Sequence, residues 1–444
     1  MKKIFLTGAT GVMGRATLRE LIANRDKQGY EITILARPSK KNRKQLTPFI
    51  QQGIKVIWGD LMDYDAVRQG VDEADIVLHI GGMVSPMADW FPEKTLRVNV
   101  GAAENIVRAA QAKESRGEEV ALVYIGSVSQ YGPRNAPRHW GRAGDPIAVA
   151  KFDAYALSKV RAEKIFAESG VKKWVSLRQT GILHTGLLFK ASDPISFHVP
   201  LHGVLEWVTD EDSGRLMERI CREDVPDSFW GNYYNIGGGE QYRLTNYEFV
   251  AMILSSLGCP PPEKSFDARW FATDNFHGMW YEDSDRLDRL FHFRSGEGPR
   301  EYFDRKKREL PWFFSLSFLA PGILIKNLMR LVALKKPLGT LSWFKNDDKE
   351  RIDAYFNGIE SWKQLPTWQQ LDLSRPSAVP QTLDHGYDES RDISTLTDDD
   401  LQKVAAKRGG RYLGQNRWQC AEGHEFTASP QLILKGGHWC PNCL

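Results

Sequence analysis

A phenol, an amine and a hydroxyl in the N-terminal part of the chain could carry out acid–base chemistry together. Tyr155 and Lys159 stand four residues apart, so a helix over this segment presents both on one face. A free phenol, with a pKa of about 10, is a poor base at neutral pH, but a nearby cation favours the phenolate. Ser127 follows an apolar run, where the carboxyl ends of parallel strands form a ligand crevice, and Ser129 is its rival. These side chains predict a site for proton transfer.

A second reactive group lies near the C-terminus and consists of three thiols and one imidazole. Its members are Cys420, His424, Cys440 and Cys443. Two close pairs suit tetrahedral zinc, and four protein ligands leave no open position, so the predicted zinc is structural. His438 is a substitute ligand, but Cys440 forms a compact Cys-x-x-Cys pair and is preferred. Because Cys221 and Cys259 lie alone, the pattern favours a metal site in a reducing compartment over a disulfide framework.

A glycine-rich segment near the N-terminus could bind phosphate. It reads Gly8-Ala9-Thr10-Gly11-Val12-Met13-Gly14, between an apolar run at residues 3–7 and a helical stretch at residues 14–23. Glycines let the backbone approach a diphosphate, whose charge is met by the amides and dipole at the helix N-terminus. The strand, the spacing and the helix together predict a dinucleotide site.

The end of the second predicted strand bears on which dinucleotide is bound. Enzymes that select NAD usually place a carboxylate there, which accepts from the ribose 2′-hydroxyl. This strand ends at Arg37, whose guanidinium could pair with a 2′-phosphate, so NADP is favoured and NAD is the alternative. The other interpretation of Arg37 is an ordinary solvated basic loop. Asp60, after the third predicted strand, could accept from the adenine amine or cap the following helix.

The elements that must position these residues predict an α/β protein with a Rossmann-type, doubly wound parallel sheet. Apolar runs at residues 3–7, 32–36, 55–58, 76–80, 121–125 and 174–177 predict its strands. We expect four units along the chain. They are a dinucleotide-binding domain (1–180), a smaller substrate lobe with an apolar helical extension (181–365), a linker (366–400) and a zinc-binding module (401–444).

These motifs resemble the extended short-chain dehydrogenase/reductase family, which contains nucleotide-sugar epimerases and 3β-hydroxysteroid dehydrogenase-like reductases. The resemblance covers about residues 1–290 and rests on the glycine turn, Asp60, Asn99, Asn105, Ser127, Tyr155, Lys159 and Arg178. It implies that Tyr155 is the proton donor or acceptor, that Lys159 binds the nicotinamide ribose and lowers the tyrosine pKa, and that Ser127 polarises the carbonyl. Asn99 is expected to fix the backbone near the cofactor. The residues expected to contact the dinucleotide are Gly8, Thr10, Gly11, Val12, Met13, Gly14, Arg37, Asp60, Leu61, Gly81, Asn99, Tyr155 and Lys159.

The chain departs from the family pattern at several places. Gly81-Gly82 stands where the family usually has two alanines, which is expected to loosen the pocket wall. Residues 128–130 lack the acidic side chains that dehydratases use to expel water, so dehydration is disfavoured. Gln179 follows Arg178 in place of the usual proline.

The segment from about 405 to 444 resembles a treble-clef zinc-ribbon module. The resemblance rests on Arg408-Gly409-Gly410, Trp418, Gly423-His424 and Trp439-Cys440-Pro441-Asn442-Cys443. Its basic residues would allow contact with nucleic acid or another protein, and a solvated surface is the alternative. A role in oligomer contacts or in closing the active site fits equally well.

Composition and one apolar stretch limit the remaining choices. The 59 basic and 56 acidic residues nearly balance, so nothing global indicates nucleic acid or an anionic membrane as the main partner. Glycines interrupt the N-terminal apolar run, so we expect a cytoplasmic protein. The stretch from Leu310 to Leu334 predicts an amphipathic helix that either packs on the substrate lobe or forms an interfacial or lid helix for an apolar substrate. Its uncharged part is shorter than the ~20 residues of a membrane span.

Three functions remain. The first is an NADP(H)-dependent oxidoreductase that acts on a carbonyl/alcohol pair of a small-molecule substrate, which the aromatic content allows to be bulky or apolar. The second is a nucleotide-sugar epimerase that uses NAD. The third is a dinucleotide-sensing regulator with a zinc module, against which the intact tyrosine and lysine argue. We also expect a homo-oligomer.

Overall fold

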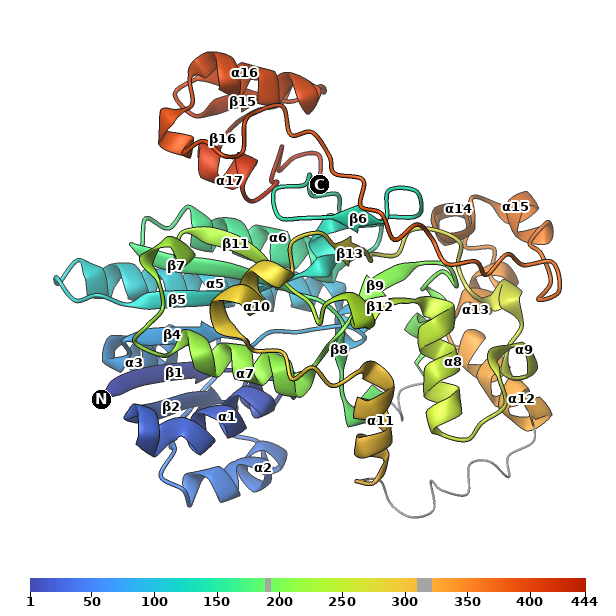
Figure 1. Ribbon diagram of the computed structural model, residues 1–444, viewed down its shortest axis with the longest axis horizontal. Coiled ribbons are helices and arrows are strands. Elements are labelled where there is room, and N and C mark those ends of the chain that lie inside the picture. The colour runs from blue at the N-terminus through green and yellow to red at the C-terminus, as the bar shows by residue number, and fades with distance from the viewer. Residues whose placement is uncertain (188–192, 310–321) are drawn as a thin grey trace.

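A parallel sheet of seven strands forms the centre of the molecule in a computed structural model that describes residues 1–187, 193–309 and 322–444 (Figure 1). The strand order is β11-β7-β5-β4-β1-β2-β3. The strands are β1 (Lys2–Thr7), β2 (Tyr30–Ala36), β3 (Lys55–Trp58), β4 (Ile76–His79), β5 (Ala121–Ser127), β7 (Lys173–Gln179) and β11 (Asn232–Ile236). All neighbouring pairs run parallel, which confirms the predicted sheet.

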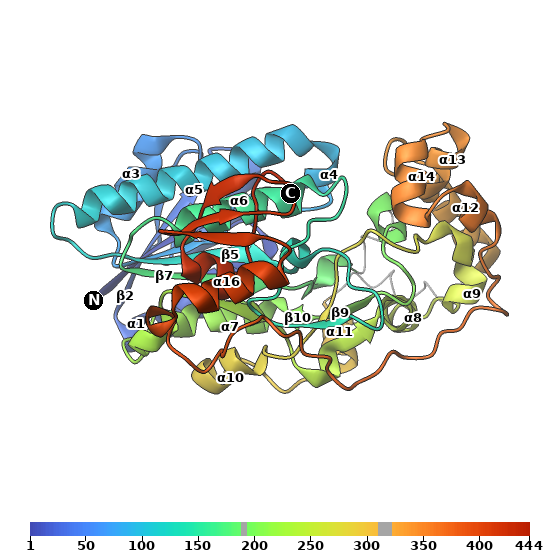
Figure 2. The same ribbon diagram turned by 90° about the horizontal axis from the view of Figure 1, so that it is seen from above.

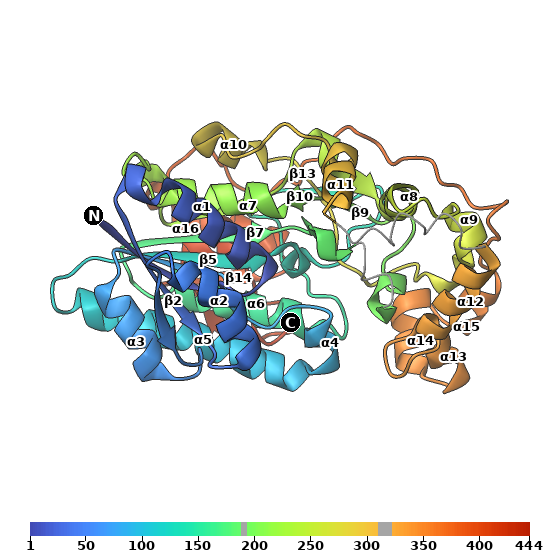
Figure 3. The ribbon, with the colours of Figure 1, turned by 90° about the horizontal axis from the view of Figure 1, so that it is seen from below.

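Helices cover both faces of the sheet, because its strands are apolar on both sides. On one face α1 (Val12–Gln28) packs against α7 (Asp210–Ile220), and α2 (Lys40–Ile50) lies nearby (Figure 3). On the other face α3 (Tyr64–Glu73), α5 (Pro92–Glu114) and α6 (Ala154–Ala167) pack side by side, with the short α4 (Met87–Trp90) before α5. The two faces bury separate apolar clusters, one around Leu18 and Met217, the other around Ile106 and Phe166.

The sheet extends beyond the boundary expected at residue 180. Tyr234 of β11 pairs with Leu177 of β7, so the chain leaves the sheet after β7 and returns to its edge about fifty residues later. Helix α7 returns with it and packs on α1. The segment 210–236 therefore belongs to the sheet domain and not to the lobe.

The smaller lobe consists of short strand pairs and short helices at one end of the sheet (Figure 1). Its strands are β6 (Trp140–Gly141), β8 (Ile182–Leu183), β9 (Val204–Glu206), β10 (Val208–Thr209), β12 (Arg243–Thr245) and β13 (Trp280–Tyr281). Its helices are α8 (Asn246–Ser256), α9 (Pro262–Ser265), α11 (Pro299–Lys307), α12 (Gly322–Ala333), α13 (Thr340–Lys345), α14 (Lys349–Phe356) and α15 (Ile359–Lys363). Helix α10 (Asp285–Phe291) packs instead against α7 and β11 of the sheet domain. The first part of the predicted apolar helix, residues 310–321, lies outside the described residues, and the remainder forms α12.

A long segment without helix or strand, residues 366–392, runs from α15 back toward the C-terminal module (Figure 1). It is tied to the sheet domain by Glu389, which accepts from Arg142 at 2.6 Å, and by His385, whose Nε2 lies 2.9 Å from a carboxylate oxygen of Asp145. The part of the predicted linker up to α16 therefore packs along the molecule.

The C-terminal module sits over the β7–β11 edge of the sheet, on the side of α6 (Figure 2). It contains α16 (Asp398–Lys407), β14 (Arg411–Gly414), β15 (Arg417–Gln419), β16 (Glu425–Thr427) and α17 (Pro430–Leu434). Trp418, Leu432 and Ile433 belong to the same apolar cluster as Trp174 and Tyr233 of the sheet. The module thus shares its core with the sheet domain. Among the described residues, no helix is long and apolar enough to cross a membrane.

Candidate functional site

A cavity of about 1190 Å³ runs from the glycine turn to the smaller lobe, at the carboxyl ends of the central strands. Twelve of the thirteen residues expected to contact the dinucleotide line it; the exception is Asn99. Ser127, Tyr155 and Lys159 line it as well. The glycine turn, the proton-transfer residues and the lobe therefore face one continuous space.

The glycine turn is shaped as a backbone cradle. Gly8 has a φ of 78°, and its carbonyl accepts from the N–H of Gly11 at 2.9 Å. A Cβ on Gly14 would lie only 2.1 Å from that carbonyl oxygen, so only glycine allows this approach. Helix α1 begins directly after Gly11 and has no acidic residue in its first turn. The free amides and positive dipole of this turn fit a diphosphate.

The next part of the cavity wall carries a cation and a carboxylate. Arg37 is exposed just after β2, and Asp60 follows β3. The carboxylate of Asp60 accepts from the N–H of Met62 at 3.0 Å, and α3 is capped by Asp63. The capping role considered for Asp60 is therefore wrong, because Asp63 fills it. Asn105 holds the same loop by donating to the carbonyl of Leu61 at 2.9 Å.

The glycine pair after β4 packs tightly. A Cβ on Gly81 would lie 3.0 Å from the backbone nitrogen of Gly8, and a Cβ on Gly82 would lie 2.9 Å from Oδ1 of Asn99. The expectation that these glycines loosen the wall is wrong, since they let β4 approach the glycine turn. Asn99 exchanges hydrogen bonds with the backbone of Met83, at 2.7 and 3.0 Å, and donates to Ser158 at 2.9 Å. It fixes backbone from behind the wall, as expected.

Ser127, Tyr155 and Lys159 meet where β5 ends against α6. Ser127 is the last residue of β5, and its Oγ lies 2.9 Å from that of Ser129, which does not line the cavity. Asp153 caps α6 by accepting from Ala156 at 2.8 Å, which places Tyr155 in the first turn. Nζ of Lys159 donates to the carbonyl of Ile125 at 2.7 Å and lies 5.8 Å from the centre of the Tyr155 ring.

Burial governs the titration of both groups. It raises the pKa of Tyr155 to about 12, although a hydrogen bond with Ser127 opposes the shift. It lowers the pKa of Lys159 to about 8, against the attraction of Glu163. The expected lowering of the tyrosine pKa is therefore not found, because desolvation penalises the phenolate. A phenol that keeps its proton is suited to donate it.

The far arm of the cavity is apolar and lies in the smaller lobe. Its wall includes the stacked rings of Trp207 and Phe249, whose centres are 4.1 Å apart. Further apolar lining residues are Phe197, Leu205, Val250, Ile253, Leu254, Phe266, Phe271, Phe276 and Met329. Among the described lining residues after position 180 there is no lysine or arginine. Among the aromatic residues at positions 270–281, Phe271 and Phe276 line the cavity, whereas Trp280 and Tyr281 are buried in the core.

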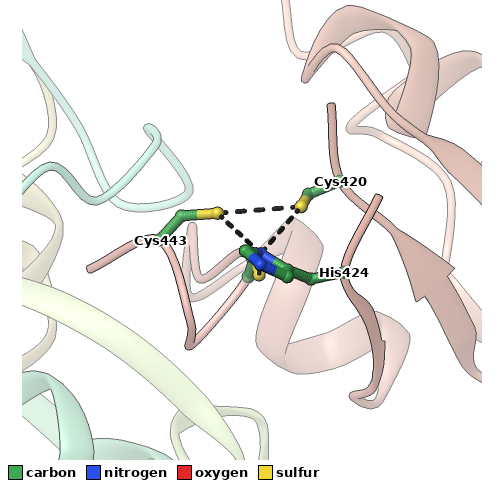
Figure 4. Close-up of side chains that lie close together, drawn as sticks. Cys420, His424 and Cys443 are labelled. Atoms are coloured by element: carbon green, nitrogen blue, oxygen red, sulfur yellow. Dashed lines mark hydrogen bonds between the residues drawn. The ribbon is translucent and has the colours of Figure 1, made fainter. Parts of the chain in front are cut away.

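The four predicted zinc ligands converge in the C-terminal module. Their donor atoms all lie within 4.8 Å of one another. Nδ1 of His424 is 3.4 to 3.7 Å from the three sulfurs, and the sulfurs of Cys420 and Cys443 are 3.7 Å apart (Figure 4). A tetrahedral zinc with bonds of about 2.3 Å to sulfur separates its ligands by about 3.8 Å. The donor set therefore fits zinc, and Cys440, not His438, completes it.

Sequence reasoning missed a buried group behind the reacting residues. Glu163 and Arg178, both fully buried, form an ion pair at 2.7 Å, and His438 joins it at 2.7 Å from Glu163. Although burial raises the pKa of Glu163, the Arg178 guanidinium holds it well below the usual range. Glu163 and His438 are 275 positions apart, so no local spacing could have indicated this contact.

Comparison with known proteins supports the fold and the N-terminal motifs. Residues 4–178 match the model of the NAD dependent epimerase/dehydratase family. In structure, the chain is similar to dTDP-glucose 4,6-dehydratase from Streptomyces venezuelae with NAD bound, with a TM-score of 0.55 and 18% identity over 70% of this chain and 96% of that one. It is also similar to UDP-glucose 4-epimerase from Bifidobacterium longum in complex with NAD+ and UDP, with a TM-score of 0.54 and 16% identity over 69% and 97% of the two chains. At these identities the structures show the fold alone.

Curated relatives match over a part of their length. An uncharacterized protein of Frog virus 3 is 29% identical over 42% of this chain and 53% of its own, and UDP-glucose 4-epimerase of Rickettsia bellii is 30% identical over 37% and 42%. The chain thus spans about half the length of these relatives. L-arabinose 1-dehydrogenase (NAD(P)(+)) of Haloferax volcanii is 25% identical over 51% of this chain and 85% of that enzyme.

Proposed function

We propose that the protein is an NADP(H)-dependent oxidoreductase of the extended short-chain dehydrogenase/reductase type, acting on a bulky, apolar carbonyl/alcohol substrate. The match of residues 4–178 to the model of the NAD dependent epimerase/dehydratase family supports this type. The single observation that carries this proposal is the continuous cavity. It joins a phosphate-binding turn to an apolar arm, with Ser127, Tyr155 and Lys159 at the junction.

The choice of NADP rests on the wall after β2. Arg37 lines the cavity at the position where a carboxylate would select NAD, and its guanidinium can pair with a 2′-phosphate. Arg37 is exposed and forms no salt bridge with another described residue. The solved structures named above contain NAD, so NAD remains the rival cofactor.

The choice of an apolar substrate rests on the lobe. A nucleotide diphosphate needs cations in its site, and the described lobe residues that line the cavity supply none. Three further cations line the cavity before the lobe: Arg134, which is paired with Asp145 at 2.7 Å, and Lys94 and Arg97 on α5. A hydrocarbon skeleton, by contrast, would bury its surface against the rings and aliphatic side chains of this arm.

The chain's own residues would then carry the proton chemistry. A bound nicotinamide supplies or accepts the hydride. In reduction, the phenol of Tyr155 donates its proton to the carbonyl oxygen as the carbon accepts hydride, and Ser127 donates a hydrogen bond to the same oxygen. Lys159, charged below its pKa of about 8, stabilises the phenolate that is left and donates to the ribose. In oxidation the same groups act in reverse.

A nucleotide-sugar epimerase is the second candidate. The similarity to UDP-glucose 4-epimerases in sequence and structure favours it. Such an enzyme would hold NAD and return the hydride to the same substrate, whereas a reductase exchanges its dinucleotide with solution.

The experiment measures whether the protein prefers NADPH or NADH and tests whether a substitution at Arg37 reverses that preference. We expect the purified protein to bind NADPH more tightly than NADH by titration. Arg37→Asp is expected to reverse this order, because it replaces a charge-assisted pair with repulsion. Lys40→Asp, an exposed change in the same basic loop that does not line the cavity, is the control. An unchanged affinity ratio in Arg37→Asp, or NAD released on denaturation, would count against the proposal.

A further inference from the structure

The C-terminal module reaches the reacting helix through one buried polar network. Its centre is Glu163, which lies on α6 one turn after Lys159. The Glu163 carboxylate accepts from Nε2 of His438 at 2.7 Å and from Arg178 at 2.7 and 3.0 Å. Gln130, also fully buried, donates to it at 2.8 Å. The histidine of the module thus contacts the helix that carries Tyr155 and Lys159.

The network continues to the reacting serine. Oε1 of Gln130 accepts from the backbone N–H of Ser127 at 2.7 Å. Ser127 is therefore held by a side chain that Glu163 in turn holds. A buried network of this kind favours one arrangement, because a member that loses its partner is left unpaired at low dielectric.

The segment that carries His438 is locked into the sheet domain. The carbonyl of Gly437 accepts from Ile147 and from Arg408, both at 3.0 Å. Gly437 has a φ of 72°, and a Cβ there would lie 2.0 Å from the carbonyl oxygen of Asp145. Cys440 follows His438 by two residues, so zinc ligation would fix the backbone that aims the imidazole.

We propose that His438 is a positioning residue and that the zinc module acts through it to hold α6 and Ser127 in place. The kinetic test of this inference rests on the proposed function, whereas the contact between the module and α6 does not. Loss of the imidazole is expected to leave the dinucleotide cradle of β1 and α1 intact and to displace the proton-transfer groups.

Kinetic measurements distinguish a positioning role of His438 from a general contribution of this residue to the stability of the fold. His438→Leu removes the donor, His438→Gln keeps an N–H donor, and Ile433→Val perturbs the same module at a fully buried site without a polar link. We expect His438→Leu to lower kcat roughly tenfold to a hundredfold with an unchanged KM for NADPH and full zinc content, because small misplacements of reacting groups are costly. His438→Gln should recover most of the loss. If His438→Leu leaves kcat unchanged, or Ile433→Val lowers it equally, the role is structural only and the proposal fails.

Hydrogen exchange tests the coupling without turnover. Removing zinc with a chelator is expected to speed amide exchange in residues 127–131 and 154–167 and to leave β1, β2 and β3 protected. Unchanged exchange in α6 would overturn the coupling, even in an active enzyme. If no carbonyl substrate is turned over, the proposed function is contradicted. The comparison of amide exchange with and without zinc then still tests the coupling.

A separate observation concerns the outer face of α12. Four large aliphatic side chains are half exposed or more: Ile323 (67%), Leu324 (50%), Leu328 (55%) and Leu331 (66%). They share one side of the helix, whereas Met329 and Ala333 on the opposite side are buried in the lobe core. Such a stripe of exposed aliphatic residues is unusual on a surface that meets only water.

The charged residues within this segment of the chain have one sign. Residues 322–346 contain five lysines and arginines and no carboxylate. Lys326 and Arg330 flank the stripe, and Lys336 follows the helix. Asp267, whose pKa Lys326 helps to lower, is itself paired with Arg269 at 3.2 Å. An apolar stripe beside cations complements an anionic lipid surface.

We infer that α12 lies flat on an anionic membrane surface. Its inner face supplies Met329 to the apolar arm of the cavity, so the contact would bring that arm close to the lipid. The 12 described residues of the helix are fewer than the ~20 that a bilayer span needs, and docking in the interface is the arrangement that its two faces suit.

Vesicle sedimentation tests this contact. The full chain is expected to sediment with phosphatidylcholine vesicles that contain phosphatidylserine, less with phosphatidylcholine alone, and less in high salt. The double change Leu324→Gln and Leu331→Gln should abolish sedimentation. Ile359→Gln, at an exposed aliphatic residue on α15, should not. Absence of vesicle binding, or a dimer in solution that the double change dissociates, would overturn the inference.

Discussion

Replacing Lys159 by methionine is expected to stabilise the ligand-free protein and to change how its stability depends on pH. Burial lowers the pKa of Lys159 from 10.5 to about 8 in the folded state, so the charged amine opposes folding. The shift corresponds to about 3 kcal/mol, present in full below the folded pKa and relieved as the pH rises toward the unfolded value. Lys159→Met removes this penalty for burying the charged amine. The lost hydrogen bond to the carbonyl of Ile125 costs about 1 kcal/mol at every pH.

The assay is chemical unfolding of the wild type and the variant between pH 7 and pH 10. The variant's advantage in free energy of unfolding is expected to shrink by about 2 to 3 kcal/mol over this range. Lys164→Met, at a half-exposed position on the same helix, is the matched control and should show no such trend. A difference between Lys159→Met and wild type that does not vary with pH would refute the reasoning, because the amine would then not be desolvated.

Three further changes test the site. Tyr155→Phe should lower turnover by about 10² to 10⁴ with little effect on dinucleotide affinity, and equal turnover would exclude the phenol as proton donor. Gly14→Ala should weaken dinucleotide binding about tenfold or more in a titration, because its Cβ would lie 2.1 Å from the Gly8 oxygen; unchanged affinity would mean that the turn is not the phosphate cradle. Cys443→Ser should lower bound zinc and the melting temperature, and full zinc content in this variant would contradict its role as a ligand.

Local patterns predicted the parts of the fold that depend on local sequence. Strands such as Ile76–His79 are continuous apolar runs buried on both faces, and the glycine turn is bounded by its own strand and helix. The edge strand Asn232–Ile236 was not assigned to the sheet, because its pairing with β7 joins segments about fifty residues apart. The hydrophobic periodicity of a segment does not indicate which distant strand it pairs with.

The same limit applies to the site. Tyr155 and Lys159 face one cavity because an i, i+4 spacing fixes them on one helix. The direction of the tyrosine pKa shift depends on burial by surrounding elements, and so the expectation from the neighbouring cation alone was wrong. The contact between Glu163 and His438 depends on how two units pack, which no spacing within either unit records.

The most direct test of the central claim is the transfer of deuterium from NADPH labelled at its transferable position to a panel of bulky apolar ketones. We predict that deuterium appears in the alcohol product with the wild type and not with Tyr155→Phe. Retention of the label in the dinucleotide, together with interconversion of nucleotide sugars by an enzyme that holds NAD, would contradict the account.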